Sequence, residues 1–237
     1  MANIQIIQGD CIKKRYFVQG ITKNDYAPWL LKKHYAHRIP CISYSYGLYE
    51  TRTKDLFGVC TFGPPARMLN DGYGCFSDGF SVQTFELNRL VISDIAEKNT
   101  LSFFVSKCLN FLPKPCCVVS YADGNSGHHG YIYQATNWLF TGITSTETVY
   151  IDERTGKSIH PRSVVSEYGS RELSSLPNYI KISKESIGKY RYFKFLGTKK
   201  DIKTMKKEFL YEIMPYPKGN NERYDASYEP KTQSLLF

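Results

Sequence analysis

Residues 120–142 read SYADGNSGHHGYIYQATNWLFTG, and this stretch joins a strand to a helix through a polar turn. The run CCVVSY at 116–121 is rich in β-branched residues and cysteine, which is typical of a buried strand. Ala-Asp-Gly at 122–124 predicts the turn that ends this strand, and a helical pattern begins at Gly130. The sequence therefore places a carboxylate, two adjacent imidazoles and the phenols of Tyr131 and Tyr133 at a strand-to-helix junction, where side chains that bind ligands or transfer protons are often found.

The helix expected after Gly130 has one apolar face. This face comprises Tyr131, Ile132, Ala135, Trp138 and Leu139, which recur at helical spacing. We expect it to pack against the rest of the protein. Tyr133, Gln134 and Asn137 fall elsewhere on the helix, so the pattern predicts that they point away from the packing face.

Six further elements are predicted around this junction. They are a helix at 24–34, strands at 42–49, 56–62 and 85–92, a helix at about 100–112 with Asn99 as its N-cap, and a strand after Gly142. The charged segment 50–55 predicts a hairpin turn, and residues 69–81 form a loop rich in Gly, Asp and Ser. A hairpin followed by strand, helix, strand, helix and strand indicates an α/β protein.

The composition indicates a globular protein that is not exported. The chain has 237 residues, 42% of them hydrophobic, which is enough to bury a core in one large domain or in one domain with an appendage. Its seven cysteines form no C-x-x-C pair, so neither a disulfide framework nor a cysteine zinc site is indicated. The first residues lack an apolar signal segment, and no stretch approaches the roughly 18 apolar residues of a membrane span. We therefore expect a cytoplasmic protein.

Positive charge is concentrated in the C-terminal part of the sequence. The formal net charge is +9, and residues 181–207 contain ten lysine or arginine residues against two acidic ones. We expect Lys199, Lys200, Lys203, Lys206 and Lys207 to contact the phosphates of a nucleic acid. Aromatic residues alternate with the charges, as in a surface that stacks on nucleic acid. The same alternation also suits a half-buried strand with a solvated lysine face.

The order of elements resembles the GNAT acyltransferase fold, a mixed sheet splayed around an acyl-donor cleft. The resemblance implies an α/β fold with a GNAT-like mixed central β-sheet flanked by helices and a basic C-terminal extension. We expect a catalytic domain at 1–180, a basic strand and helix at 181–219 that continue the same domain, and a flexible tail at 220–237.

One feature of the GNAT pattern is missing. GNAT enzymes hold the coenzyme A pyrophosphate on a Gly-rich loop at a helix N-terminus, whereas residues 93–100 here read SDIAEKNT, with two carboxylates and no glycine. Acetyl-CoA is therefore a doubtful donor. The donor stays open between an acyl and a glycyl compound.

Several separated blocks resemble the phage Mom family, GNAT-like proteins that convert adenine in DNA to its N6-carbamoylmethyl form. The blocks are KKHYAHRIP at 32–40, FGVCTFGPP at 57–65, ELNRLVISD at 86–94 with NTLSFF at 99–104, the stretch 120–138, and KYRYFKFLG at 189–197 with MPYPKG at 214–219. The resemblance implies a phage or prophage protein that shields DNA from restriction nucleases.

The resemblance also implies a set of site residues. The expected catalytic residues are His34, Tyr35, Ser102, Asp123 and Tyr133. Arg89 and Asn137 are expected to contact the substrate.

Each of these residues has a structural alternative. His34 and Tyr35 could close a helix, and Asp123 could be an Asx-turn residue. Tyr133 could be a core aromatic. Arg89 could pair with Glu86 on a strand face. Ser102 could be a first-turn capping residue.

A metal site is a further possibility, because His128 and His129 lie close to Asp123 in the sequence. Two imidazoles and a carboxylate can bind non-haem iron. Adjacent residues at a helix start point about 100° apart, so at most one of these histidines is expected to face the same ion as Asp123. The alternative ligand set is His34, Tyr35 and Asp123, since the resemblance implies iron. His128 could instead bond to a turn carbonyl.

The resemblance implies an enzyme that flips adenine out of double-stranded DNA, or takes it from a transiently opened strand, in the cytoplasm of a bacterial host. We expect Asp123 to orient or deprotonate the amine and Tyr133 to act as an acid, while His34 and Tyr35 shape the donor site or bind metal. An activated glycyl compound is a possible donor. Two other functions stay open, a coenzyme A-dependent N-acetyltransferase acting on a protein or small amine and a noncatalytic DNA-binding phage protein.

Overall fold

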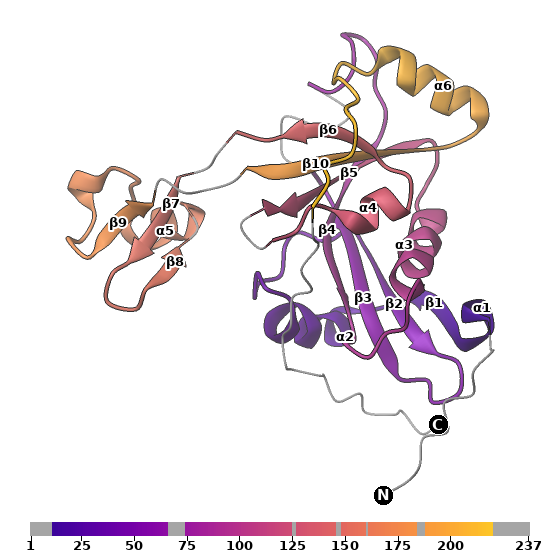
Figure 1. Ribbon diagram of the computed structural model, residues 1–237, viewed down its shortest axis with the longest axis horizontal. Helices are drawn as coiled ribbons and strands as arrows, with labels where there is room; N and C mark the ends of the chain where they lie inside the picture. Colours follow the sequence, from indigo (N-terminus) through magenta and orange to yellow (C-terminus); the bar gives the residue numbers. More distant parts are fainter. Residues whose placement is uncertain are drawn as a thin grey trace, which may run out of the picture.

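The protein is built on a seven-stranded central sheet with the strand order β1-β2-β3-β4-β5-β10-β6 (Figure 1). The computed structural model describes residues 11–65, 74–124, 127–145, 148–159, 161–183 and 188–219. The strands are β1 (Tyr16–Gly20), β2 (Tyr44–Glu50), β3 (Leu56–Gly63), β4 (Thr84–Ile92), β5 (Cys116–Asp123), β6 (Leu139–Ile143) and β10 (Lys189–Leu196).

The central sheet is mixed. Strands β4 and β5 run parallel, because the helix α3 (Thr100–Phe111) connects them as a crossover. All other neighbouring pairs are antiparallel, and β10 lies between β5 and β6. The α/β class and the mixed central sheet predicted from the sequence are confirmed.

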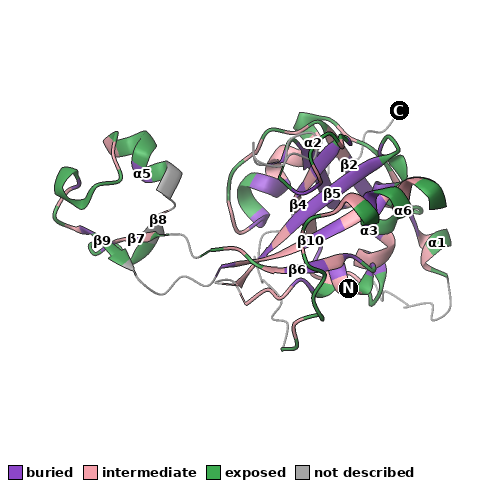
Figure 2. Cartoon of the chain, turned by 90° about the horizontal axis from the view of Figure 1, so that it is seen from above, coloured by how far each residue is buried: buried purple, intermediate pink, exposed green. Residues whose placement is uncertain are grey.

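Helices cover both faces of this sheet. On one face, α3 packs with the short helices α1 (Ile12–Arg15) and α4 (Tyr131–Ala135) over a cluster that includes Val118. On the other face, α6 (Lys199–Glu208) packs through Met205 over a cluster that includes Val119. The neighbouring residues Val118 and Val119 of β5 thus point to opposite faces of the sheet, because side chains alternate along a strand. Figure 2 shows the central strands as a buried interior between these layers.

A second helix pair covers the same face as α6, at the other end of the sheet. The helix α2 (Lys23–Pro28) continues directly into the π-helix η1 (Trp29–Lys33). Trp29 and Leu30 of η1 are buried against Val59 of β3. The helical segment ends at Lys33, so His34 lies at its C-terminus, as predicted.

A small lobe is inserted between β6 and β10. This inserted lobe, residues 148–183, contains β7 (Val149–Asp152), β8 (Lys157–Ile159), β9 (Ile180–Ser183), α5 (Pro161–Tyr168) and the 3-10 helix η4 (Leu173–Ser175). Its own core consists of Tyr150, Val164, Leu176 and Ile180. Figures 1 and 2 show the lobe beside the main body rather than packed on it.

The domain limits expected from the sequence fall near β9 and after α6. The boundary expected at residue 180 falls inside β9, and the expected extension at 181–219 supplies β10, a strand within the central sheet, followed by α6. The expected tail at 220–237 lies outside the described residues. None of the helices within the described residues has the length and the apolar sequence that a transmembrane helix needs.

The helix after Gly130 is shorter than predicted and faces differently. It ends at Ala135, because Asn137 adopts a left-handed conformation with φ of 57° and Leu139 already begins β6. Tyr131, assigned to the packing face, is 64% exposed, whereas Tyr133, assigned to the outer face, is 7% exposed. That orientation was therefore predicted wrongly, since five residues are too few for helical periodicity to fix a face.

The polar loop predicted at 69–81 is only partly described. Residues 69–73 lie outside the described part. Cys75 and Phe76 are buried, and Phe76 pairs with Phe209 just after α6. This end of the loop therefore belongs to the core beneath α6.

Candidate active site

The candidate site lies where β4 and β5 separate. The two strands pair over three residue pairs, from Thr84↔Cys117 to Glu86↔Val119. The register between β3 and β4 then shifts, which leaves Asn88 as a bulge residue on β4. A bulge bends its strand and increases its twist, so β4 turns away from β5 at this point.

Side-chain hydrogen bonds hold the bulge in place. The Thr61 hydroxyl donates to Asn88 Oδ1 over 2.6 Å, and Asn88 Nδ2 donates to the carbonyl of Cys41 over 3.0 Å. Asn88 thereby links β3, β4 and the segment before β2. The separation of β4 and β5 is thus a fixed feature of the fold.

A cavity of about 680 Å³ occupies the space between the separated strands. It brings together six of the residues predicted from the sequence: His34, Tyr35, Arg89, Ser102, Asp123 and Tyr133. Asn137 and the five lysines of α6 are not among the lining residues. Cavities that bind small molecules usually enclose about 300 to 1,000 Å³, so this one has the size of a ligand site.

Tyr133 forms part of the inner wall of the cavity. Its ring packs against Trp138 and Tyr192, with centroids 5.0 and 5.1 Å away. Its hydroxyl oxygen lies 2.7 Å from Ser120 Oγ. Burial raises the pKa of Tyr133 well above its usual value, so the phenol is protonated at neutral pH. Tyr133 is therefore both a core aromatic and a cavity residue.

His34 and Tyr35 form a stacked pair at the polar end of the cavity, with ring centroids 4.4 Å apart. Burial lowers the pKa of His34 to about 3, and the positive charge of Arg89 adds to this effect. His34 Nδ1 accepts a hydrogen bond from the backbone N–H of Ala36, so the ring is neutral with its proton on Nε2. This histidine can donate a hydrogen bond into the cavity.

Asp123 is the last residue of β5, opposite Lys189 of β10. Burial raises the pKa of Tyr35, and the negative charge of Asp123 raises it further. The Asp123 carboxylate is therefore close enough to interact electrostatically with the Tyr35 hydroxyl. The Asp123 carbonyl accepts a hydrogen bond from the N–H of His128, and His128 also lines the cavity. The ring of His129 instead packs against Tyr190, with centroids 5.2 Å apart. The two adjacent histidines thus point to different places, as expected.

Arg89 supplies positive charge from β4. Its guanidinium donates to the carbonyls of Asn88 over 2.6 Å and of Arg38 over 3.4 Å. Burial lowers the pKa of Arg89, and the neighbouring Tyr35 opposes this shift. Arg89 remains charged, because an arginine pKa starts above 12. It is a half-buried cation in the wall of the cavity.

Ser102 lies in the first turn of α3. Its hydroxyl donates to the Asn99 carbonyl over 2.9 Å, so the side chain also stabilises the N-terminus of the helix. Asn99 occupies the predicted N-cap position but makes no side-chain capping bond, since its backbone is left-handed with φ of 70°. Ser102 is therefore a cavity residue with a structural partner.

The carboxylates of the loop between β4 and α3 are paired with cations. Lys33, only 2% exposed, lies 2.6 Å from Asp94. Arg15 forms an ion pair with Glu97. The sequence suggested an acidic loop that would repel a phosphate-bearing donor, but both negative charges are compensated by distant parts of the chain.

The residues proposed to bind iron do not match a metal site. The stacked rings of His34 and Tyr35 face each other at 28°, whereas an imidazole binds an ion in the plane of its ring. Among the described residues, no group of three or more His, Cys, Asp or Glu side chains could hold a metal ion. The expectation of iron at His34, Tyr35 and Asp123 is not supported.

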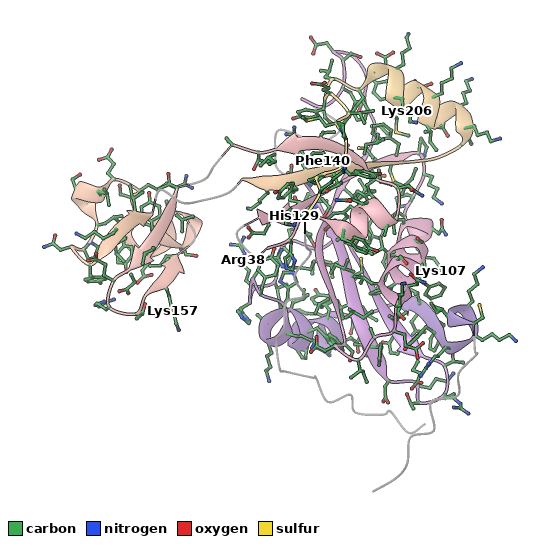
Figure 3. The ribbon with its side chains drawn as sticks, in the orientation of Figure 1. Arg38, Lys107, His129, Phe140, Lys157 and Lys206 are labelled. Carbon is green, nitrogen blue, oxygen red and sulfur yellow. The ribbon has the colours of Figure 1, made fainter. Side chains whose placement is uncertain are left out.

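The basic segment lies apart from the cavity. Figure 3 shows Lys206 of α6 beyond β6 and β10, away from Arg38 and His129. Tyr192, Phe193 and Phe195 of β10 are buried in the two main clusters. These rings therefore pack the core, and they do not form a surface for stacking on bases.

Sequence patterns did not indicate two residues that build the site. Ser120 is 1% exposed inside an apolar strand, where a lone hydroxyl signals a buried hydrogen bond. Lys33 follows Lys32 in a helix, and the two lysines alone do not indicate which of them is buried. The apolar neighbours Trp29 and Leu30, at i−4 and i−3, were the available signal.

The chain is similar to known proteins over most of its length. The model of the Mom protein family matches residues 15–218. Methylcarbamoylase mom of Escherichia phage Mu is 30% identical over 193 residues, which cover 78% of this chain and 77% of the relative.

Solved structures of acetyltransferases are also similar to this chain. An acetyltransferase of Bacillus subtilis in complex with CoA has a TM-score of 0.42 and 13% identity, covering 77% of this chain and 98% of its own. A spermidine N-acetyltransferase of Vibrio cholerae has a TM-score of 0.43 and 7% identity, covering 76% and 94%.

Proposed function

Because this chain belongs to the Mom protein family, we propose that it is a transferase that modifies adenine in DNA. The product we propose is N6-carbamoylmethyl adenine. The observation that carries the proposal is that six residues carried over from the family resemblance line one cavity: His34, Tyr35, Arg89, Ser102, Asp123 and Tyr133. These residues come from four separate segments of the chain, so a purely structural role for each would not require them to meet.

The geometry supports a flipped base rather than a base read in the groove. The cavity is recessed between β4 and β5, whereas the N6 amine of adenine is base-paired within the duplex, so the whole base must leave the helix to reach the cavity. A volume of about 680 Å³ leaves room for a donor beside the base. We place this reaction in the cytoplasm of the bacterial host.

We assign the base to Asp123. It lies at the end of β5 beside Tyr35, and a carboxylate there can take the proton that the N6 amine loses when it attacks. The neutral His34 and the charged Arg89 are donors on the same wall, and they suit a carbonyl oxygen that gains negative charge.

The donor we propose is an activated glycyl compound. The adenine N6 attacks the glycyl carbonyl carbon, the N6–C bond forms, and the leaving group departs with its electron pair. The glycyl amine then attacks C6 through a five-membered ring, the C6–N6 bond breaks, and N6 leaves as the terminal amide after it receives the proton of the attacking amine. The glycyl adenine and the product are isomers, so neither an oxidant nor a reductant is needed.

One observation favours a second candidate, a coenzyme A-dependent N-acetyltransferase. The negative charges of Asp94 and Glu97 are paired with Lys33 and Arg15, respectively. The loop before α3 therefore repels a pyrophosphate less than its sequence suggests. Acetyl-CoA far above its dissociation constant should then raise the melting temperature of the protein by several degrees. An unchanged melting temperature would exclude this candidate.

Nucleoside mass spectrometry tests the proposed function. DNA from cells that express the protein should contain carbamoylmethyl adenine, and cells that express Asp123→Asn should contain unmodified adenine. Unmodified DNA in both strains would leave a noncatalytic DNA-binding protein as the better description. With adenine labelled by nitrogen-15 at N6, fragmentation should find the label in the side-chain amide. Label on the nitrogen bonded to C6 would exclude the glycyl route.

A further inference from the structure

Two buried hydroxyl groups meet where β4 and β5 separate. Ser120 Oγ lies 2.8 Å from the carbonyl oxygen of Leu87 and 2.7 Å from the hydroxyl oxygen of Tyr133. Leu87 and Ser120 directly follow the last paired residues of the two strands, Glu86↔Val119. The serine side chain thus continues the link between β4 and β5 by one more position.

The chemistry of these groups fixes the direction of both hydrogen bonds. A serine hydroxyl carries one proton, and a backbone carbonyl can only accept. Both contacts can be made at once only if Ser120 donates to Leu87. Tyr133 must then donate its own proton to Ser120 Oγ, because the serine proton is already in use.

The directions of these two hydrogen bonds decide whether Tyr133 can donate or accept a hydrogen bond toward the cavity. Its proton points into the protein, toward Ser120, so the remaining lone pair of its oxygen is available to a ligand in the cavity that it lines. Burial raises the pKa of Tyr133, so the phenol is neutral and remains a partner of Ser120 at neutral pH. The acid role expected for Tyr133 would require this bond to break first.

We propose that Tyr133 is a hydrogen-bond acceptor toward the cavity, that Ser120 sets this direction, and that the pair selects a substrate group with an N–H. This rests on the proposed function in one respect, namely that the group is the N6 amine of adenine. A base with a carbonyl oxygen at the same position, such as hypoxanthine, meets an acceptor there and is disfavoured. Ser120, which acts through Tyr133, is in this sense a positioning residue.

The hydrogen-bond order can be observed without any substrate. In protein with isotope-labelled tyrosine, nuclear magnetic resonance should show a Tyr133 hydroxyl proton that exchanges slowly with water. Ser120→Ala should abolish this signal, and Ser120→Thr, which keeps a hydroxyl, should preserve it. A rapidly exchanging Tyr133 hydroxyl proton in the unmodified protein would overturn the proposal.

Selection of the base is tested by DNA binding. Two duplexes carry a single adenine or a single hypoxanthine opposite an abasic site, within the same flanks of G·C pairs, so that extrusion costs little in either and no other adenine is present. The unmodified protein should bind the adenine duplex about tenfold more tightly, the effect of leaving one buried polar group unpaired. Tyr133→Phe should bring the ratio close to one. Ser120→Ala should shift it toward hypoxanthine, because the freed phenol can donate to a carbonyl.

The outcomes separate this inference from the proposed function. If Tyr133→Phe keeps the tenfold ratio, or Ser120→Ala leaves it unchanged at a normal melting temperature, the selection role is wrong while DNA modification stands. If the unmodified protein binds neither duplex, the proposed function fails together with the adenine assignment. The exchange rate of the Tyr133 hydroxyl proton would then still show whether Ser120 fixes the direction of the Tyr133 hydroxyl.

Discussion

At the scale of single residues, burial gives this site its chemistry. His34 would be partly protonated near neutral pH in water, yet here it is neutral, and burial keeps Tyr133 neutral to a higher pH than in water. Their neutrality follows from desolvation, which disfavours the charged form of any side chain. The site therefore presents neutral hydrogen-bonding groups at His34 and Tyr133 beside the charged side chains of Arg89 and Asp123.

The buried His34 predicts how stability depends on pH. Its folded pKa of about 3 lies below the unfolded value of about 6.5, so protons bind the unfolded chain more tightly and stability falls as the pH drops below 6.5. Between pH 7.5 and 5 this one residue should cost about 2 kcal/mol of the free energy of unfolding. Urea unfolding at both pH values measures the loss.

The controls for this prediction are two glutamine variants. His34→Gln should lower the pH dependence by roughly the same 2 kcal/mol, and His37→Gln, at an exposed position, should keep it. An equal pH dependence in His34→Gln and the unmodified protein would show that His34 titrates normally.

Asp123 predicts a loss of modification without a loss of stability. Asp123→Asn keeps the volume of the half-buried side chain and removes its basicity, so the rate should fall at least about a hundredfold. The melting temperature should change by less than about 3 °C. The matched variant Asp78→Asn, at an exposed position, should modify DNA normally. Modification by Asp123→Asn at a comparable rate would assign the base to another residue.

At the scale of elements, the short helix α4 depends on the glycine before it. Gly130 has φ of +79°, and a Cβ placed there would lie 2.4 Å from the ring of Tyr192 and 3.0 Å from Tyr133. A side chain at this position would be strained by its backbone and would also push the two tyrosines. The orientation of Tyr133 is thus set partly by a residue that has no side chain.

Gly130→Ala should destabilise the protein through both effects. We expect a loss of about 2 to 4 kcal/mol, of which about 1 kcal/mol comes from the left-handed backbone. Gly79→Ala is the matched control, since Gly79 has φ of +83° and nothing within 4 Å of the added carbon. Chemical denaturation of both variants separates the clash from the backbone strain. Equal losses would mean that the tyrosine rings move aside freely.

The helix α6 is the element expected to contact DNA phosphates. Its lysines lie on the exposed side, while Met205 anchors the helix. Replacing Lys199, Lys200, Lys203, Lys206 and Lys207 by Gln should weaken binding to all sequences alike. It should also reduce the salt dependence of binding by about 0.9 in slope for each phosphate that the helix no longer binds. Gln is nearly as good a helix former as Lys, so the fold should not change.

Fluorescence titrations over a range of salt concentrations measure this slope. A control with Lys107→Gln and Lys114→Gln tests lysines of α3 and of the turn after it, since α3 packs on the sheet face opposite α6. This control should leave the slope unchanged. An unchanged slope in the α6 variant would place the DNA contacts elsewhere.

At the scale of the whole molecule, the fold consists of a main body and an inserted lobe with separate cores. The four residues of the lobe core belong to none of the three clusters of the main body. The lobe leaves the central sheet where β6 ends and β10 begins, and there the N–H of Thr144 donates to the carbonyl of Lys189 over 2.9 Å. Gly188 lies so close to Thr144 that no side chain would fit.

This geometry predicts that the lobe can be removed. Deleting residues 146–187 together with Ser145→Asn would leave an Asn-Gly pair between β6 and β10, a sequence that favours a two-residue hairpin turn. The shortened protein should fold cooperatively, with a melting temperature within about 5 °C of the full chain. Thermal unfolding followed by circular dichroism measures both the cooperativity and the melting temperature. A protein that fails to fold would show that the lobe stabilises the main body.

Local sequence patterns predicted the elements from α2 to α4 and the mixed central sheet. A continuous apolar run indicated β5, and helical spacing indicated α3. These patterns missed α1, β1 and the inserted lobe, and they placed β6 after Gly142 although it begins at Leu139. The separated family blocks also indicated six of the residues that line the cavity. These features are local in sequence, or they are carried by motifs that can be recognised independently of one another.

How those residues act depends on contacts that exist only in the folded chain. The bond from Ser120 to Leu87 spans 33 residues and the ion pair of Lys33 with Asp94 spans 61, so no local pattern contains them. The short helix α4 turned Tyr133 inward, against its predicted face, because five residues follow the packing of their neighbours rather than a period. Hydrogen-bond direction, charge compensation and burial arise from groups that meet only after folding, and they set the chemistry of the cavity.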